Sequence, residues 1–409
     1  MFQKLVPAFL LTFVNVLGFS ILMPILPFVV KDYGAPEWFY GLLLTFYSAF
    51  QFFGAPFLGA LSDHMGRKPV LLVSQAGTLL SWFVFVFALY LPKDQQLFGF
   101  SIALWVIAFS RILDGITGGN ASVTNAYVAD ITTSKEKASV FGYLGGIAGI
   151  GLIVGPGLGG LTASSSWGYL GTMVTAIAIS TVTLIAIFFW LKESHPEEKR
   201  SPAGKQRIVK NLFLIKRIRE LNISPFLKRI FLLKLLFSTT VACYIGSIAL
   251  YLIDLFDFNK QELGFFMLVV GLFLSFNQAV VSRMFVRWFG EYNTLKIGLS
   301  GVFIGLFCIT LTSNLWVFIS FYYIMNLGLS LSFPTFNSVI AQHANPQKQG
   351  ETMGVSDSIH SFAMASFPLV SAALYGWIGS YAYWIYAAFP LVAVFIAFGT
   401  KSEAAPTEN

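Results

Sequence analysis

Two pairs of ionisable side chains fall inside long apolar runs of this sequence, where such groups are rare. Arg111 and Asp114 lie three residues apart, as do Asp357 and His360, so each pair shares one face of a helix. A carboxylate next to an arginine or a histidine within a membrane can carry or relay protons. The alternative for either pair is a structural contact that never titrates.

The composition indicates which elements must position these residues. Of the 409 residues, 56% are hydrophobic and 11% are charged. A soluble chain of this size cannot bury so much apolar surface, so the sequence predicts an all-α protein that crosses a membrane repeatedly. The apolar runs are continuous and do not alternate with polar residues, which excludes a transmembrane β-barrel.

Twelve apolar segments follow one another, and most reach the length of about 20 residues that spans a bilayer. The first six are expected at roughly 5–30, 39–61, 69–91, 97–124, 137–163 and 168–191. The second six are expected at roughly 230–255, 260–283, 294–312, 314–342, 350–375 and 380–400. Pro24 and Pro27 should kink the outer end of the first segment.

Basic residues are distributed unequally between the two sides of this arrangement. Lys31, Lys93 and Lys260 lie on one side and Arg111 lies in a helix, while the remaining Lys and Arg lie on the side of both termini. This bias identifies that side as the cytoplasm. The net charge of +7 is therefore a topology signal, and no nucleic-acid partner is expected.

One long polar segment divides the chain into two halves. Residues 192–229 are basic, and their apolar residues from Leu212 to Leu221 recur at near-helical spacing. This pattern is typical of an amphipathic helix at the membrane surface, with a disordered linker as the alternative. The predicted domains are an N-terminal six-helix bundle (1–191), a cytoplasmic linker (192–229), a C-terminal six-helix bundle (230–400) and a cytoplasmic tail (401–409).

A short charged loop, residues 59–68, joins the second and third segments. Asp63 and Arg67 can pair with charges at neighbouring helix ends, and Asp130 is a candidate partner for Arg67. The alternative is that these charges only fix the topology. We favour a gate that closes the cytoplasmic side, formed by Gly59, Asp63, Gly66, Arg67, Lys68 and Asp130.

These features resemble the major facilitator superfamily. The run 59–68 is similar to the loop between its second and third helices, and family members use that loop as a gate. Arg111 begins a run similar to a motif of drug:proton antiporters. The run Gly155-Pro156-Gly157-Leu158-Gly159-Gly160 is similar to their antiporter signature. The resemblance is closest to tetracycline-resistance proteins and implies two pseudo-symmetric bundles around a central cavity.

The sequence also departs from tetracycline exporters. Those proteins carry acids in the first and third helices, where this chain has Asn15 and Ser81, and we find no acid in the ninth helix either. The resemblance therefore does not extend to tetracycline as the substrate. Coupling through Arg111, Asp114, Asp357 and His360 is expected instead.

The predicted function is export of a small amphipathic organic molecule by proton antiport, with alternating access. The chain has no ATP-binding, zinc-protease or hydrolase motif, so neither an enzyme, a cofactor nor a metal is expected. The alternatives are a facilitator or proton symporter for a nutrient, metabolite or metal chelate, and a membrane receptor that does not transport. A monomer in the cell membrane is expected, in the inner membrane if the source is bacterial. Candidate residues for the substrate cavity are Asn15, Gln51, Asn120, Tyr244, Tyr251, Asn277, Gln278 and Asn326.

Overall fold

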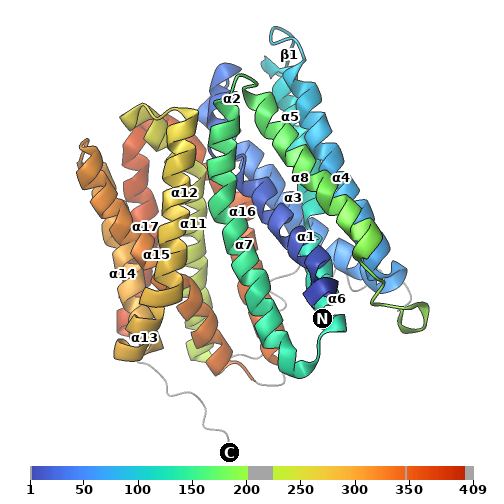
Figure 1. The fold of residues 1–409 in the computed structure, drawn as a ribbon. Helices are drawn as coiled ribbons and strands as arrows, with labels where there is room; N and C mark the ends of the chain where they lie inside the picture. Colours follow the sequence, from blue (N-terminus) through green and yellow to red (C-terminus); the bar gives the residue numbers. More distant parts are fainter. Residues whose placement is uncertain (1, 201–223, 346–347, 401–409) are drawn as a thin grey trace, which may run out of the picture. The chain divides into compact units, whose positions relative to one another are not determined.

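The computed structural model describes residues 2–200, 224–345 and 348–400 (Figure 1). This part of the chain is almost entirely helical, as predicted. Its strands are β1 (Gln96–Leu97) and β2 (Phe100–Ser101), which pair antiparallel in a small hairpin. The amphipathic helix predicted between Leu212 and Leu221, and the tail 401–409, lie outside the described residues.

The described residues divide into two compact units. One comprises 2–200 together with 258–269, and the other comprises 224–257 together with 270–400. The division falls within α12 (Lys260–Phe276), whose first part packs with the N-terminal helices. The backbones of α12 and α7 (Ser134–Ala163) approach closely at two glycines. If Gly264 carried a side chain, its Cβ would lie 2.8 Å from the backbone of Gly160.

The first unit is built from two short and six longer helices before α12. The short ones are α2 (Leu26–Asp32) and the 3-10 turn η1 (Glu197–Lys199). The longer ones are α1 (Phe2–Ser20), α3 (Glu37–Met65), α4 (Arg67–Leu89), α5 (Ile102–Gly118) with its continuation α6 (Ala121–Ile131), α7 (Ser134–Ala163) and α8 (Tyr169–Trp190).

The second unit begins with the long helix α11 (Pro225–Phe256), five residues before the predicted start of the seventh segment. After α12 come a π-helical turn η2 (Asn277–Val281), α13 (Ser282–Phe289), α14 (Glu291–Cys308) and the 3-10 turn η3 (Ile309–Leu311). The chain ends with α15 (Leu315–His343), α16 (Gln349–Ile378), the 3-10 turn η5 (Gly379–Tyr381) and α17 (Ala382–Gly399).

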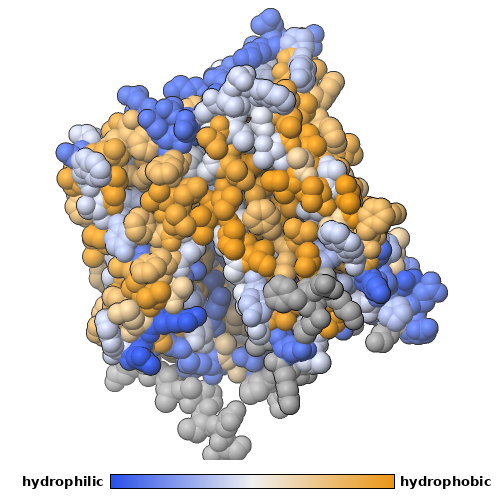
Figure 2. Space-filling view, in the orientation of Figure 1, coloured by the Kyte–Doolittle hydropathy of each residue, from blue (hydrophilic) through white to orange (hydrophobic). Residues whose placement is uncertain are grey.

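Ten helical stretches in the described residues are long and apolar enough to cross a membrane. The last of them, Gln349–Gly399, contains both α16 and α17, and a shorter apolar helix, Leu5–Ser20, occupies the place of the first predicted crossing. This helix count agrees with the twelve predicted crossings. On the face shown in Figure 2, apolar residues cover the middle of the helices and hydrophilic residues gather toward their ends.

Two of the predicted segments differ in detail from the structure. The segment 5–30 is two helices, because the chain turns at 21–25 around Pro24, which has no N–H to donate. Pro27 lies in the first turn of α2, where a missing N–H is tolerated. The segment 97–124 was placed too early, since residues 96–101 form the hairpin and the helix continues as α6 to Ile131.

Candidate functional site

Arg111 and Asp114 form a buried ion pair on α5. Arg111 Nη1 lies 3.2 Å from Asp114 Oδ2, and the two side chains are 2% and 4% exposed. From α4, the rings of Trp82 and Phe85 lie 4.9 and 5.6 Å from the guanidinium carbon, so aromatic faces cover the cation. The predicted pairing along one helix face is present, and the pair is deep within the first unit.

The surroundings of this ion pair are polar but incompletely bonded. Thr78 and Ser81 of α4 place hydroxyl groups beside the Asp114 carboxylate. In the described part of the chain, Arg111 Nη2 is buried and has no hydrogen-bond partner. Burying an ion pair costs desolvation energy that is regained only when the geometry and the remaining hydrogen bonds are good. Because Arg111 Nη2 has no partner among the described residues, part of this cost is not regained.

A chain of hydrogen bonds connects this region to α1. Thr78 Oγ1 lies 3.0 Å from Thr117 Oγ1, and Ser74 Oγ donates to the Thr117 carbonyl at 2.7 Å. Asn120, between α5 and α6, donates from Nδ2 to Ser74 Oγ at 2.6 Å and accepts from Asn15 Nδ2. The predicted cavity residues Asn15 and Asn120 therefore contact one another and are tied to the helix that holds the ion pair.

The charged run 59–68 forms the end of α3, Gly66 and the start of α4, and its charges contact one another and the end of α6. Arg67 Nη1 lies 2.6 Å from Asp63 Oδ1, and Arg67 Nε lies 3.1 Å from Asp130 Oδ2 at the end of α6. Arg67 Nη1 also donates to Ser62 Oγ at 2.7 Å. The Arg67 side chain is only 8% exposed, while those of Asp63 and Asp130 are 40% and 27% exposed. One guanidinium thus joins the ends of three helices, α3, α4 and α6.

A carboxylate that the sequence reasoning did not select completes this cluster. Glu193, just after α8, accepts from the backbone N–H of Arg67 at 2.9 Å and of Lys68 at 3.1 Å. It therefore caps α4, which begins after Gly66 in a backbone conformation with φ +100° that favours glycine. Ser194 Oγ donates to Asp130 Oδ2 at 3.1 Å. In the sequence, the only indication of this role was the position of Glu193 directly after an apolar run.

Replacing Glu193 by alanine is expected to destabilise the first unit by about 0.5–2 kcal/mol, the usual cost of losing a helix cap. Thermal unfolding of the purified protein in detergent measures this change. Glu198→Ala is the matched control, since that side chain is exposed and lies only five positions away. Equal unfolding temperatures for the two variants would show that the cap contributes nothing.

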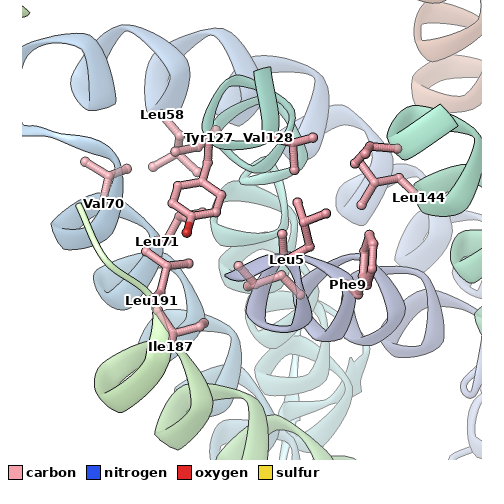
Figure 3. Close-up of a cluster of buried hydrophobic side chains, with 14 residues drawn as sticks. Leu5, Phe9, Leu58, Val70, Leu71, Tyr127, Val128, Leu144, Ile187 and Leu191 are labelled. Carbon is pink, nitrogen blue, oxygen red and sulfur yellow. The ribbon is translucent and has the colours of Figure 1, made fainter. Parts of the chain in front are cut away.

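A cluster of buried hydrophobic side chains lies beside the charged loop (Figure 3). Leu58 immediately precedes the loop, Val70 and Leu71 follow it, and Tyr127 lies three residues before Asp130. Side chains from α1, α3, α4, α6, α7 and α8 meet in this cluster. The charged residues Asp63, Arg67 and Asp130 therefore lie beside a buried apolar cluster.

Three glycines in the second half of α7 pack directly against other parts of the first unit. Cβ atoms on Gly155 and Gly159 would collide with Ser20 and Ile21 at the end of α1, and one on Gly160 would meet the Lys260 carbonyl of α12. Pro156 lies within the same helix, and its carbonyl oxygen faces Gly264. The glycine motif thus lets α7 approach α1 on one face and the start of α12 on another.

Gly159→Ala is expected to destabilise the protein by about 1–3 kcal/mol, the usual cost of overpacking a close contact. The added methyl would meet the Ile21 carbonyl, which belongs to the backbone and cannot rotate away. Gly146→Ala on the same helix is the control, because a Cβ there has nothing within 4 Å. Thermal unfolding of both variants tests this packing, and a Gly159→Ala protein as stable as the control would contradict it.

In the second unit, the structure corrects the predicted pairing of Asp357 with His360. Both lie on α16, but no ion pair joins them in the described residues. His360 Nδ1 instead lies 3.3 Å from Ser238 Oγ on α11, and Asp357 is exposed. Both residues lie on the side of α16 that packs against α11, where His360 contacts Ser238 and Asp357 interacts electrostatically with Lys234.

A lysine that the sequence reasoning counted among the cytoplasmic basic residues is buried in this region. Lys234 lies in α11 and is 4% exposed. Its Nζ lies 5.2 Å from the ring centroid of Phe336 and 6.0 Å from that of Phe333, both on α15. The charges of Lys234 and Asp357 are close enough to interact electrostatically. A lone lysine within an apolar run was the signal that could have found it.

Apart from Gln278, the other predicted cavity residues are hydrogen-bonded within their own units. Gln51 Nε2 donates to Tyr47 Oη and to the Gly118 carbonyl, each at 3.2 Å. In the second unit, Tyr244 and Tyr322 bond through their hydroxyls, and Tyr251, 1% exposed, donates to the Ile309 carbonyl at 3.0 Å. Further contacts involve Asn277, which accepts from Tyr323, and Asn326, which donates to the Val270 carbonyl, while Gln278 is half-buried in η2.

Comparison with known proteins identifies the family. The model of the Major Facilitator Superfamily matches residues 8–368. This chain belongs to the major facilitator superfamily. Proteins of the superfamily are transporters and not enzymes, so the chain is a multi-pass membrane protein that transports a small molecule.

The relatives include antibiotic-resistance proteins. A class H tetracycline resistance protein of Pasteurella multocida is 27% identical over 93% of this chain and 91% of the relative. The quinolone resistance protein NorA of Staphylococcus aureus is 24% identical over 89% of this chain and 87% of the relative. The human organic anion transporter MFSD10 has a similar fold, with a TM-score of 0.71 and 23% identity, and the match covers 97% of this chain and 99% of that one.

Proposed function

We propose that this facilitator-superfamily transporter exports a small amphipathic organic molecule in exchange for protons. The observation that carries the proposal is the buried Arg111–Asp114 ion pair within a spanning helix. An ionisable pair at that depth is costly and is found where a function requires it. The relatives named tetracycline and quinolone resistance proteins support export of a drug-like molecule. Tetracycline itself is not proposed, because Asn15 and Ser81 stand where tetracycline exporters carry acids.

In the proposed cycle, Asp114 takes up a proton and leaves Arg111, which then rearranges within its aromatic surroundings. A neutral carboxylic acid is tolerated in a low-dielectric region far better than a carboxylate, so protonation changes which conformer is favoured. Asp357 and His360 are proposed to take part as a second coupling region. The cluster of Asp63, Arg67 and Asp130 closes the cytoplasmic side.

The remaining assignments follow the same proposal. The domains 1–191 and 230–400 are proposed to rock against one another about a substrate site formed by the predicted cavity residues. The excess of basic residues in the loops supports cytoplasmic placement of both termini. We propose a monomer in the cell membrane, which is the inner membrane if the source is bacterial.

The experiment is to measure the pH change inside everted vesicles or proteoliposomes that contain the purified protein. A panel of lipophilic cations, zwitterions and neutral drugs is added one compound at a time under an imposed proton gradient. Proton release that follows the addition of one compound is the expected result. Substrate flux unaffected by the gradient would replace antiport by facilitated diffusion. Proton movement in the direction of the substrate would replace it by symport, and binding without any flux would indicate a receptor.

A further inference from the structure

The second unit buries a lysine whose charge is not neutralised by a direct ion pair. Lys234 is 4% exposed, and no carboxylate in the described part of the chain lies within 4.0 Å of its Nζ. The nearby rings of Phe333 and Phe336 stabilise the cation only partly. Because a buried charge is normally paired, this ammonium is available to an anionic group of a ligand.

The packing of α11 against α16 places Asp357 opposite this lysine. Three contacts set the register of the two helices. Ser238 lies 3.3 Å from His360, Gly246 faces Pro368, and Tyr375 donates to Asp254 at 3.1 Å. The residue numbers rise together, so the helices run in the same direction. One helical turn before Ser238 is Lys234, and one turn before His360 is Asp357.

The two charges also lie at the same depth. Lys234 is nine residues from the start of α11 and Asp357 is eight from the start of α16, about 13 and 12 Å along the helices. Asp357 is exposed although it lies within a spanning helix. A carboxylate at that depth is strongly disfavoured in contact with lipid and tolerated in contact with water. The exposed side of Asp357 is therefore expected to face an aqueous route.

We propose that Lys234 and Asp357 bind the two charged ends of a zwitterionic amphipathic substrate. Lys234 takes the anionic group, Asp357 takes the cationic group, and the half-buried ring of Phe333 contacts the apolar body. This proposal rests on the proposed export function and names the class of substrate. A proton on Asp357 would remove the partner of the substrate's cation, so substrate and proton compete for one carboxylate, as antiport requires.

The test measures equilibrium binding to the purified full-length protein in detergent, without a gradient. The probes are Nε-dansyl-L-lysine, which is a zwitterion, its methyl ester, which is a cation, and its Nα-acetyl derivative, which is an anion. Fluorescence titration is expected to show the zwitterion binding at least about tenfold more tightly than either derivative. Lys234→Gln is expected to reduce zwitterion affinity to that of the ester and leave the ester unchanged. Asp357→Asn should reduce it to that of the acetyl derivative.

Two controls keep the outcome unambiguous. Lys228→Gln removes an exposed charge from the same helix and should change nothing, while Lys234→Arg keeps the charge and should keep the preference for the zwitterion. Unchanged ester binding shows that Lys234→Gln is folded, and unchanged binding of the acetyl derivative shows the same for Asp357→Asn. Equal affinities for the three probes, an equal loss for all three in Lys234→Gln, or no binding below about 1 mM would overturn the proposal. Zwitterion binding without proton release would retain this site and refute antiport instead.

Discussion

Asp114→Asn is expected to abolish substrate-driven proton release. Asparagine cannot carry a proton, and it leaves the guanidinium of Arg111 buried without its counter-ion. Removing one partner of a buried ion pair costs about 3–5 kcal/mol, so the variant should also unfold at a lower temperature. The measurements are the vesicle pH assay for coupling and thermal unfolding in detergent for stability.

A double variant separates these two effects. Arg111→Met with Asp114→Leu replaces both charges by apolar groups, which is often neutral or stabilising by about 1–4 kcal/mol. This protein is expected to fold like the wild type and yet release no protons. If it still couples substrate to protons, or if a folded Asp114→Asn protein does, Asp114 is not the carrier.

Arg67→Gln is expected to impair transport by at least about tenfold while having a smaller effect on stability. The substitution removes the cation between Asp63 and Asp130, whose carboxylates then repel each other across the ends of α3 and α6. Both carboxylates are partly exposed, so solvent screens the loss, and each contact contributes only about 1 kcal/mol to folding. In the proposed cycle, in contrast, opening and closing of the cytoplasmic side depend directly on this contact.

The readout for the gate is substrate flux together with the accessibility of the predicted cytoplasmic side. A cysteine introduced at Ser62, which hydrogen-bonds Arg67, should react faster with a water-soluble maleimide in the Arg67→Gln background. Lys137→Gln is the control, since that lysine is exposed at the start of α7. Normal flux and unchanged labelling in Arg67→Gln would assign these charges to topology alone.

The sequence determined the class of this protein because the signal for membrane spans is local. Each span needs only a continuous apolar run of about 20 residues, and the run does not depend on its neighbours. The pair Arg111–Asp114 was also predictable, since three residues along one helix fix the contact. The turn around Pro24 divided one predicted segment into two helices, and the hairpin at 96–101 moved the start of another, without changing the number of crossings.

Contacts between helices were decided by the tertiary structure. The side chain of His360 contacts Ser238, because α16 packs against α11. Spacing along one helix cannot reveal a partner on another helix. The roles of Glu193 and Lys234 also depend on contacts between distant parts of the chain. Glu193 caps α4, which begins about 126 residues earlier, and Lys234 lies opposite Asp357 on α16.

The sequence by itself therefore determined the superfamily, the helical membrane architecture and the residues whose charge is unusual within it. The tertiary structure alone decided the contacts of His360, Glu193 and Lys234 with distant parts of the chain. The physical reason is range: hydrophobicity and helix periodicity act over a few consecutive residues, whereas the partner of a buried charge is set by the packing of helices far apart in the sequence.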